Sequence, residues 1–343
     1  MLKNNEYYIG FSKKDDDRFR ASSGGIGTAI IRHLMSLPEY GTSITFYFDT
    51  GLCKYVPKLI FSAKDINVCG SIYQDIDLIR FIRENIENIK NGIVMTCAPC
   101  QVMPIRSMLN RKGIKNFIIS YSCSGQTTIE GTWCYYKFLE IDKENVKNMQ
   151  YRGNGWPSGI QIWLKDGNVV KKNNWTEPWI SIHQSNLFKP KRCLFCKLDM
   201  GHQADINIAD PWLERYKKTE TKGATLCVIC SEYGKQVFNE MITSKEIEVV
   251  PSTYDDYSIA ESPNIHKEIL LQREKKYRKR LSKLLDVKVY RWWATKSLRN
   301  MTLAIKFHNL IRLCSREINL KYDIPKLVNK IKQKNKLFII RKD

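Results

Sequence analysis

A C-x-x-C pair at Cys193 and Cys196 constrains this chain more than any other feature of its sequence. The tight turn between the two residues points both sulfurs the same way, so two thiolates can converge on one metal centre. A polar loop follows, and then an alternating, strand-like run at residues 204–209 that ends in Asp210-Pro211-Trp212. Two ligands are only half of a metal site, so the other ligands must come from elsewhere in the chain.

The cysteine content supports metal or redox use. The 343-residue chain has eleven cysteines, and its first residues contain no apolar stretch typical of a secretory signal. We therefore expect a cytoplasmic protein without a disulfide framework. No apolar run approaches the roughly 18 residues needed to span a membrane. Several cysteines in apolar surroundings are expected to be ordinary buried thiols.

Two predicted strands each end in a cysteine. Residues 92–96 form a short apolar strand that leads into Cys97-Ala98-Pro99-Cys100-Gln101 and a helix. The next strand, at residues 115–122, leads to Cys123 before another helical segment. This alternation predicts an α/β fold with a mixed, largely parallel sheet at its core, and ligand sites in such folds lie at the carboxyl ends of the strands.

A smaller β portion is expected after the α/β part. Residues 151–156 read YRGNGW, and an Asp166-Gly167 turn joins two strand-like runs, which is the pattern of a β-hairpin. We expect this hairpin and the C-x-x-C segment to form a smaller metal-binding portion of one domain.

The positive charge lies at the end of the chain. Of the formal net charge of +21, residues 267–343 carry +17, from 23 lysines and arginines against 6 aspartates and glutamates. We predict an oxidoreductase-like body at residues 1–264 and a basic, helical C-terminal extension at residues 265–343. The extension interleaves basic and aromatic residues, so it is either a solvated helical face or a contact for a partner or an anionic membrane surface. Nucleic acid is the less favoured partner, and the sequence does not fix the oligomeric state.

Residues 19–29 read FRASSGGIGTA and run into an apolar helical segment. Ser22 and Ser23 are candidate helix caps, and Gly24 and Gly25 permit close approach of a bound group to the backbone. The dinucleotide fingerprint is incomplete, because Ile30 stands where a third glycine is required. The segment is therefore either an ordinary capped helix or a phosphate-binding helix N-terminus.

Four cysteines form the preferred metal site: Cys100, Cys123, Cys193 and Cys196. A rival set replaces Cys123 with Cys97, which completes a second C-x-x-C pair. Four thiolates suit a structural zinc ion or a [4Fe-4S] cluster, and spacing alone leaves both open. Buried free thiols remain the alternative to any metal site.

Five motifs in order resemble those of the coenzyme F-420 hydrogenase/dehydrogenase beta subunit family. They are SSGG, CAPCQ after a strand, the lone Cys123, YRGNGWP, and RCLFC followed by ADINIADPW, and they span about three-fifths of the chain. Members of this family are iron–sulfur flavoproteins that pass electrons between a cluster, a flavin and, in archaeal enzymes, the deazaflavin coenzyme F-420. Relatives also occur beside polysaccharide biosynthesis genes.

The resemblance implies cofactors and residues for them. It implies a [4Fe-4S] cluster on the four cysteines and FAD held between the glycine-rich loop and the strand ends. A redox partner protein or a deazaflavin would exchange electrons with them. The residues that match the family's flavin-binding motifs are Ser23, Gly24, Gly25, Thr96, Gln101, Asn154 and Trp156. Asp205 and Asp210 match acidic positions that support the cluster loop.

The sequence departs from the family in three places. The ferredoxin-like cysteine run of longer relatives is absent, the usual Gly-Thr-Pro-Cys reads Cys97-Ala98-Pro99-Cys100, and the basic extension falls outside the resemblance. Coenzyme F-420 itself is thus the least supported cofactor. No side chains form a catalytic constellation, so no catalytic residue is assigned. The alternative function is a non-enzymatic, metal-stabilised module that docks through its basic extension.

Overall fold

The computed structural model describes residues 5–173, 176, 179–184, 188, 190–194 and 202–261. Cys196 and the entire basic extension lie outside the described residues, so the domain boundary at residue 264 stays a prediction. Among the described helices, none is long and apolar enough to cross a membrane.

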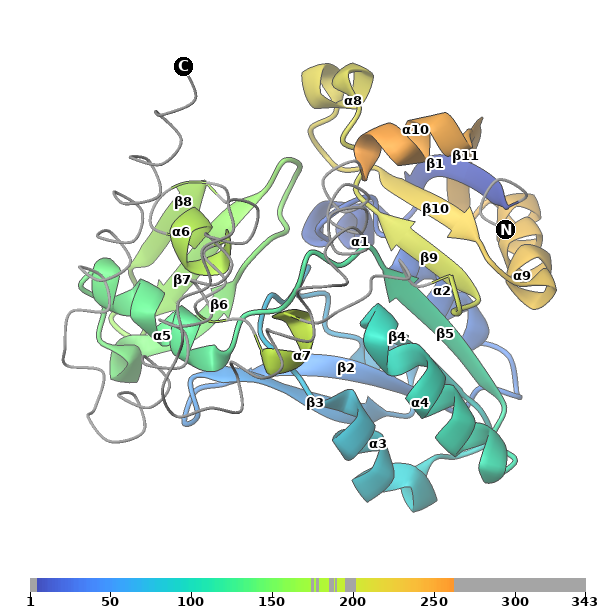
Figure 1. Ribbon diagram of the computed structural model, residues 1–343, viewed down its shortest axis with the longest axis horizontal. Coiled ribbons are helices and arrows are strands. Elements are labelled where there is room, and N and C mark those ends of the chain that lie inside the picture. Colours follow the sequence, from blue (N-terminus) through green and yellow to red (C-terminus); the bar gives the residue numbers. More distant parts are fainter. Residues whose placement is uncertain are drawn as a thin grey trace, which may run out of the picture.

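An eight-stranded mixed sheet forms the larger lobe, in the order β11-β1-β10-β9-β5-β4-β2-β3 (Figure 1). The strands are β1 (Glu6–Ser12), β2 (Thr42–Asp49), β3 (Lys54–Ile60), β4 (Ile93–Cys97), β5 (Asn116–Tyr121), β9 (Ile206–Ala209), β10 (Thr225–Ile229) and β11 (Ile247–Ser252). The central strands β2, β4, β5 and β9 are parallel, while the other neighbouring pairs are antiparallel. The predicted α/β fold with a parallel core is confirmed.

Helices cover both faces of this sheet. The helices of the larger lobe are α1 (Asp15–Arg20), α2 (Ile26–Leu34), α3 (Leu78–Asn85), α4 (Pro99–Arg111), α8 (Glu214–Thr219), α9 (Glu232–Thr243) and α10 (Tyr254–Ala260), with short 3-10 turns η2 (Ala63–Asp65) and η3 (Ile86–Asn88). Successive side chains of a strand point to opposite faces of the sheet, so each strand contributes to two cores. In β10, Cys227 packs with α2 and α9, whereas Leu226 and Val228 pack with α10 on the other face. Helices α3 and α4 pack against β4 and β5 and lie together at the bottom of Figure 1.

Both edge strands of the large sheet contain a proline. Pro57 lies in β3 and Pro251 in β11, the two strands at the ends of the sheet order. Proline has no backbone N–H to donate, so it is tolerated at an edge and hinders pairing with another chain. Because proline argues against a strand unless its edge position is known, β3 and β11 are difficult to predict from the sequence.

A three-stranded antiparallel sheet forms the smaller lobe, at the left of Figure 1. It comprises β6 (Val146–Gln150), β7 (Gly159–Leu164) and β8 (Val169–Asn173), preceded by the 3-10 turn η4 (Lys143–Asn145). Helices α5 (Ile129–Phe138) and α6 (Trp179–Gln184) pack against it around the fully buried Trp179. The predicted hairpin is therefore present as β7 and β8.

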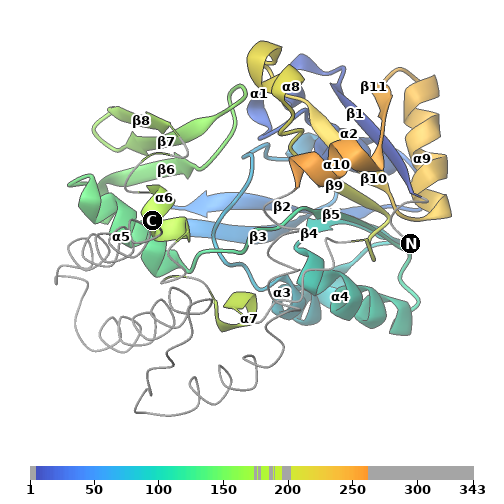
Figure 2. The same ribbon diagram turned by 45° about the horizontal axis from the view of Figure 1, so that its top comes forward.

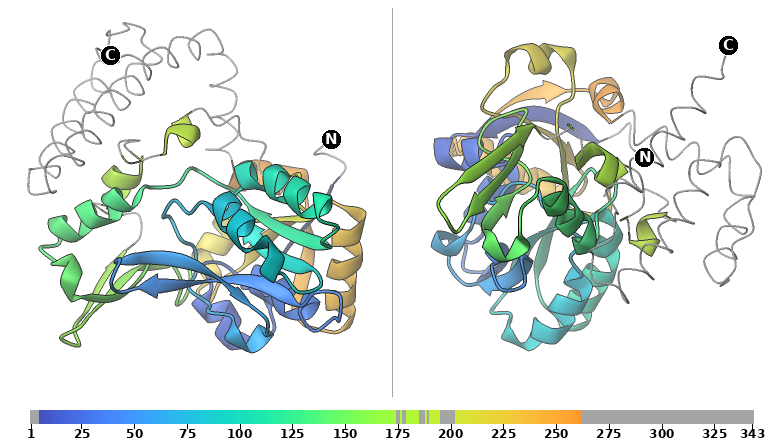
Figure 3. Two further views of the ribbon diagram at one scale, coloured as in Figure 1. Left: turned by 90° about the horizontal axis from the view of Figure 1, so that it is seen from below. Right: turned by 90° about the vertical axis from the view of Figure 1, so that its left-hand side faces the viewer.

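The β2–β3 hairpin connects the lobes. Phe46 and Phe48 of β2 and Tyr55 of β3 pack into the core of the smaller lobe, and Figure 2 shows the hairpin extending toward it. A last short helix, α7 (Lys191–Leu194), carries Cys193. It lies beside α3 in Figure 2 and stands apart from it in the right-hand view of Figure 3.

Candidate functional site

The parallel strands end at one edge of the sheet, and several of the sequence motifs lie there. Strand β4 ends at Cys97, β5 ends two residues before Cys123, and β9 ends directly before Asp210. Strand β1 has the same direction as β9, because both are antiparallel to β10, and it leads through α1 to the SSGG loop. Carboxyl edges of parallel strands are the usual ligand sites of open α/β sheets.

The cysteines at this edge differ in exposure. Cys97 is the buried last residue of β4, and burial raises the pKa of its thiol. Cys100 is exposed in the first turn of α4, after Pro99 at the first helical position. Cys123 is half-buried, and its sulfur accepts the Gly125 N–H at 3.4 Å. An accessible thiol at a helix N-terminus is suited to metal binding as the thiolate.

Tyr121 lies within electrostatic reach of three of these thiols. Burial raises its pKa well above the usual range, and negative charge on Cys123, Cys97 and Cys100 raises it further. Its hydroxyl accepts a hydrogen bond from Nε2 of Gln126 at 3.1 Å. The structure thus brings Cys97, Cys100 and Cys123 within electrostatic reach of the same tyrosine.

The electrostatic contacts of Arg192 connect Cys193 with the same edge of the sheet. Burial alone would lower the pKa of Arg192, but the charge of Asp75, followed by those of Cys193 and Cys100, raises it. The guanidinium pairs with Asp75, and one nitrogen lies 3.5 Å from Oε1 of Gln126. Cys193, Cys100 and the Gln126–Tyr121 contact therefore belong to one neighbourhood, while Cys196 lies outside the described residues.

The cysteines of this edge are candidate ligands of a thiolate-bound group. Within the described ranges, no three His, Cys, Asp or Glu side chains form a group that could hold one metal ion. The hydroxyls of Ser120 and Ser122, just before Cys123, are buried without a hydrogen-bond partner among the described residues. Such hydroxyls can donate hydrogen bonds to the sulfur atoms of a bound group.

A buried ion pair between Arg152 and Asp210 is the second feature of this edge. Arg152 lies in YRGNGW and Asp210 in ADINIADPW, and their side chains are only 5% and 13% exposed. Two guanidinium nitrogens donate to the carboxylate at 2.5 and 2.9 Å. Burial would raise the pKa of Asp210, but Arg152 holds it below its usual range. Both charges are thus retained inside the protein.

Asp210 also binds the other motifs. Its Oδ1 accepts hydrogen bonds from Oγ of Ser23 at 2.7 Å and from Nε1 of Trp156 at 3.0 Å. Arg152 donates in turn to the carbonyl of Ser22 at 2.8 Å, and the rings of Trp156 and Trp212 lie 4.9 Å apart. One carboxylate therefore connects SSGG, YRGNGW and ADINIADPW.

The two glycines of the loop have structural reasons to be glycine. A Cβ on Gly24 would lie 2.5 Å from the carbonyl oxygen of Gly10, and Gly25 adopts φ +77° as the N-cap of α2. No side chain caps α2, although the Gly24 N–H is donated to Oγ1 of Thr225 at 2.8 Å. The predicted serine cap is absent, because α2 begins at Ile26 and its N-cap position is occupied by Gly25, while Ser23 donates to Asp210.

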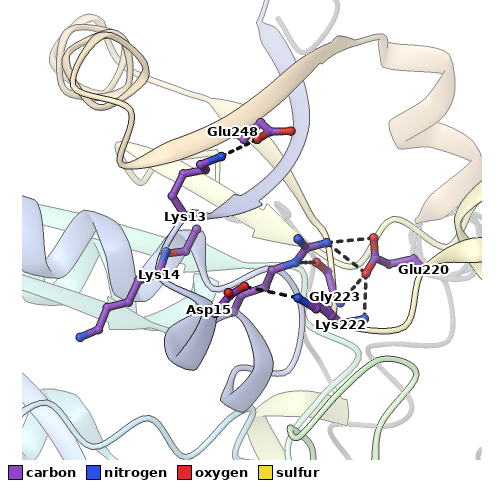
Figure 4. A network of polar contacts seen from close by, with 9 residues as sticks. Lys13, Lys14, Asp15, Glu220, Lys222, Gly223 and Glu248 are labelled. Atoms are coloured by element: carbon purple, nitrogen blue, oxygen red, sulfur yellow. Dashed lines mark hydrogen bonds and ion pairs between the residues drawn. The ribbon is translucent and has the colours of Figure 1, made fainter.

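Charged contacts on the surface frame this loop (Figure 4). Lys13 pairs with Glu248, and Lys222 pairs with Asp15 of α1. Glu220 accepts the backbone N–H groups of Lys222 and Gly223 at 2.9 and 2.7 Å. A Cβ on Gly223 would lie 1.9 Å from the carbonyl oxygen of Ser23, so this turn packs directly on the SSGG loop.

The other predicted cofactor residues are mainly held by protein contacts. Gln101 is buried and donates to the carbonyl of Ile76 at 2.8 Å, and Asn154 donates to Oε1 of Gln150 at 3.0 Å. Thr96 is half-buried in β4, directly before Cys97. Their roles toward a cofactor remain predictions.

Sequence reasoning missed Arg152, Tyr121 and the Arg192–Asp75 pair as parts of the site. The sequence does contain a signal for Arg152. It is an arginine in a glycine-rich turn, and Asp210 is an aspartate before Pro-Trp, so both are charged residues in weakly charged motifs. No comparable signal marks Tyr121, and Asp75 pairs with Arg192, which lies 117 residues away in the sequence.

Part of the chain matches a known protein family. Residues 90–254 match the sequence profile for the C terminus of the coenzyme F420 hydrogenase/dehydrogenase beta subunit. This match supports the resemblance to the coenzyme F420 hydrogenase/dehydrogenase beta subunit family that the sequence motifs indicate. The matched region contains the cysteines of the carboxyl edge and both members of the buried ion pair.

A solved structure has the same fold. It is a chain of the xenon-derivatised F420-reducing [NiFe] hydrogenase complex from Methanosarcina barkeri. The match has a TM-score of 0.59 and 15% sequence identity, and covers 78% of this chain and 92% of that chain. At this identity the likeness shows the fold alone. No curated protein matches the chain significantly.

Proposed function

We propose that this protein is an iron–sulfur flavoprotein that transfers electrons between a [4Fe-4S] cluster, FAD and a redox partner. The observation that carries the proposal is the gathering of Cys97, Cys100, Cys123 and Cys193 around Tyr121 and Arg192 at the carboxyl edge. The family consists of hydrogenase and dehydrogenase subunits, which are oxidoreductases. The fold and this donor set are consistent with that chemistry.

In this proposal Cys100, Cys123, Cys193 and Cys196 hold the cluster. Cys97 is the weaker candidate, because it is buried within β4 and its thiol pKa is raised by burial, which disfavours the thiolate that binds metal. Cys100 is exposed, and Cys123 and Cys193 are half-buried. The cluster, when bound, supplies a one-electron store.

The flavin would lie between the SSGG loop and the strand ends. The N-terminus of α2 supports this placement, because no described side chain caps it and the first N–H groups of a helix have no partner within the helix. Ser23, Gly24 and Gly25 would shape that loop, with Thr96, Gln101, Asn154 and Trp156 around it. The bound flavin would supply two-electron hydride chemistry.

The chain's own residues position the cofactors and exclude water. Arg152 and Asp210 fix the SSGG loop relative to YRGNGW, and the Trp156 and Trp212 rings cover their ion pair. The Ser120 and Ser122 hydroxyls would donate to cluster sulfurs. No proton transfer by a side chain is required, because electron and hydride chemistry belongs to the cofactors.

The electron partner stays open between a redox protein and a small carrier. The likeness in fold to a chain of a hydrogenase complex favours a partner protein. Coenzyme F-420 is the small-molecule candidate that the family name suggests. Participation in polysaccharide biosynthesis is a further proposal on the family resemblance alone.

Anaerobic purification followed by iron, sulfide, zinc and flavin analysis tests the proposal. We expect about four iron and four sulfide per chain with bound FAD. Zinc without flavin would instead support the alternative function, a metal-stabilised docking module, and would overturn the oxidoreductase assignment. Reduction of the bound flavin by a chemical one-electron donor, followed by its reoxidation with F-420, separates the two carrier classes.

A further inference from the structure

Arg192 directly precedes Cys193 in α7 and reaches residues on both sides of the cysteine edge. Its guanidinium pairs with Asp75, and one nitrogen lies 3.5 Å from Oε1 of Gln126. The Gln126 amide donates to the Tyr121 hydroxyl at 3.1 Å. These contacts connect the helix of the C-x-x-C motif with the end of β5, from which Cys123 follows.

The partner of Arg192 is held firmly. The Asp75 N–H donates to the carbonyl of Thr127 at 2.8 Å. The neighbouring Gln74 is buried, and its amide bonds to the N–H and the carbonyl of Tyr55 at 2.8 and 2.9 Å. Asp75 therefore projects from an anchored segment, and it can fix the position of a cation on α7.

Arg192 is a permanent cation next to a site of negative charge. A guanidinium stays protonated at every accessible pH. The charges of Cys193 and Cys100 act on it after that of Asp75, which shows that it lies within electrostatic reach of thiols from two motifs. The Arg192 and Asp75 side chains are 42% and 22% exposed, so solvent weakens but does not abolish their fields.

We propose that Arg192, held in place by Asp75, is a positioning residue whose positive charge raises the reduction potential of the cluster on the neighbouring cysteines. This inference rests on the proposed function, since it requires a cluster there. A thiolate-bound cluster is negatively charged, and one added electron makes it more so. A nearby cation therefore favours the reduced state, and a nearby anion disfavours it.

The two members of the pair should then act with opposite sign. Burial raises the pKa of Asp75 and Arg192 opposes that rise. At pH 8, far above the ordinary range of a carboxyl pKa, Arg192→Gln removes the cation beside an ionised Asp75, so the midpoint potential should fall. Asp75→Asn leaves the cation uncompensated, so the potential should rise. A tenfold change in the ratio of reduced to oxidised cluster, the order expected for one unit charge near a partly exposed site, corresponds to about 59 mV for one electron.

The experiment is an EPR-monitored redox titration of anaerobically purified full-length protein near pH 8. The variants are Arg192→Gln, Arg192→Lys, Asp75→Asn and the double variant Arg192→Gln/Asp75→Asn. We expect a lowered, an unchanged, a raised and a near-wild-type potential, respectively. Arg215→Gln is the matched control, since Arg215 pairs with Asp256 on the surface away from the cysteines at 2.6 and 2.9 Å.

Shifts of the same sign, or potentials equal to that of Arg215→Gln, would overturn the inference while leaving the proposed function intact. A wild-type protein without iron would instead refute the proposed function itself. If Arg192→Gln retains no iron, Arg192→Lys and Asp75→Asn still decide. The first must keep the wild-type potential and the second must raise it, and any other result overturns the inference.

Discussion

Replacing Arg152 with methionine should strongly destabilise the protein, because the buried carboxylate of Asp210 would lose its counterion. Methionine fills a similar volume but donates no hydrogen bond. Asp210 would keep only two of its donors, the Ser23 hydroxyl and the Trp156 indole, and Arg152 would release the Ser22 carbonyl. Removing one partner of a buried pair costs about 3–5 kcal/mol, a large share of a total stability of about 5–15 kcal/mol.

Urea unfolding of the apoprotein measures this effect without any contribution from a cofactor. The matched control is Arg215→Met, which breaks an Arg–Asp pair whose arginine side chain is 56% exposed and which should cost at most about 1 kcal/mol. The double variant Arg152→Met/Asp210→Leu should recover much of the loss, since an apolar pair needs no counterion. Equal stability of Arg152→Met and Arg215→Met would refute the reasoning.

The pH dependence provides a second check on the same variant. In the wild type, Arg152 depresses the pKa of Asp210, so the stability from this carboxylate is present above its unfolded pKa of about 3.9 and is lost below it. In Arg152→Met, burial acts alone and raises that pKa, so protonation favours the fold as the pH falls. The stability difference between the two proteins should therefore narrow from pH 7 toward pH 4.

Three further predictions concern the cysteine edge, the SSGG loop and the N-terminus of α9. Cys193→Ser should abolish the cluster, whereas Cys97→Ser should keep it, and iron analysis would reverse this ligand assignment if only the second variant lost its iron. Gly24→Ala should destabilise the apoprotein by about 1–3 kcal/mol through overpacking against Gly10. The control Gly27→Ala in α2 should be near neutral, because its Cβ would meet only the end of the Ile208 side chain. Equal unfolding midpoints for the two variants would contradict this. Ser231→Ala should cost about 1–2 kcal/mol, because its Oγ caps α9 at the Gly234 N–H and donates to Asp205, and an unchanged urea midpoint would refute that role.

Local sequence patterns predicted the parallel core well. The apolar run at residues 92–96 corresponds to β4, and the segment at 115–122 corresponds to β5, each within one residue. Pro99 marks the start of α4, as a proline at the first helical position does. These signals are local, so they can be recognised without knowledge of the tertiary structure.

The antiparallel strands were harder to predict. Strand β1, which follows a polar start, takes its place only by pairing with β10 and β11, and the proline in β3 argues against a strand unless its edge position is known. The convergence of Arg152, Ser23 and Trp156 on Asp210 depends on contacts between distant segments. A single sequence carries no direct record of such contacts.

The cofactor residues show the same limit. The sequence singled out Gly24 and Gly25 for cofactor binding, yet their immediate neighbours are backbone atoms of Gly10, Thr225 and Asp17. Sequence motifs identify where the chain is constrained, but the packing partner that causes the constraint is visible only in three dimensions. The four-cysteine assignment stays a prediction, because Cys196 lies outside the described residues.

The most direct test of the account is the cofactor content of wild-type protein purified without oxygen. Iron, acid-labile sulfide, zinc and flavin are measured per chain, together with the visible spectrum. The account predicts about four iron and four sulfide with FAD, and loss of all the iron in Cys193→Ser. Stoichiometric zinc with neither iron nor flavin would contradict it.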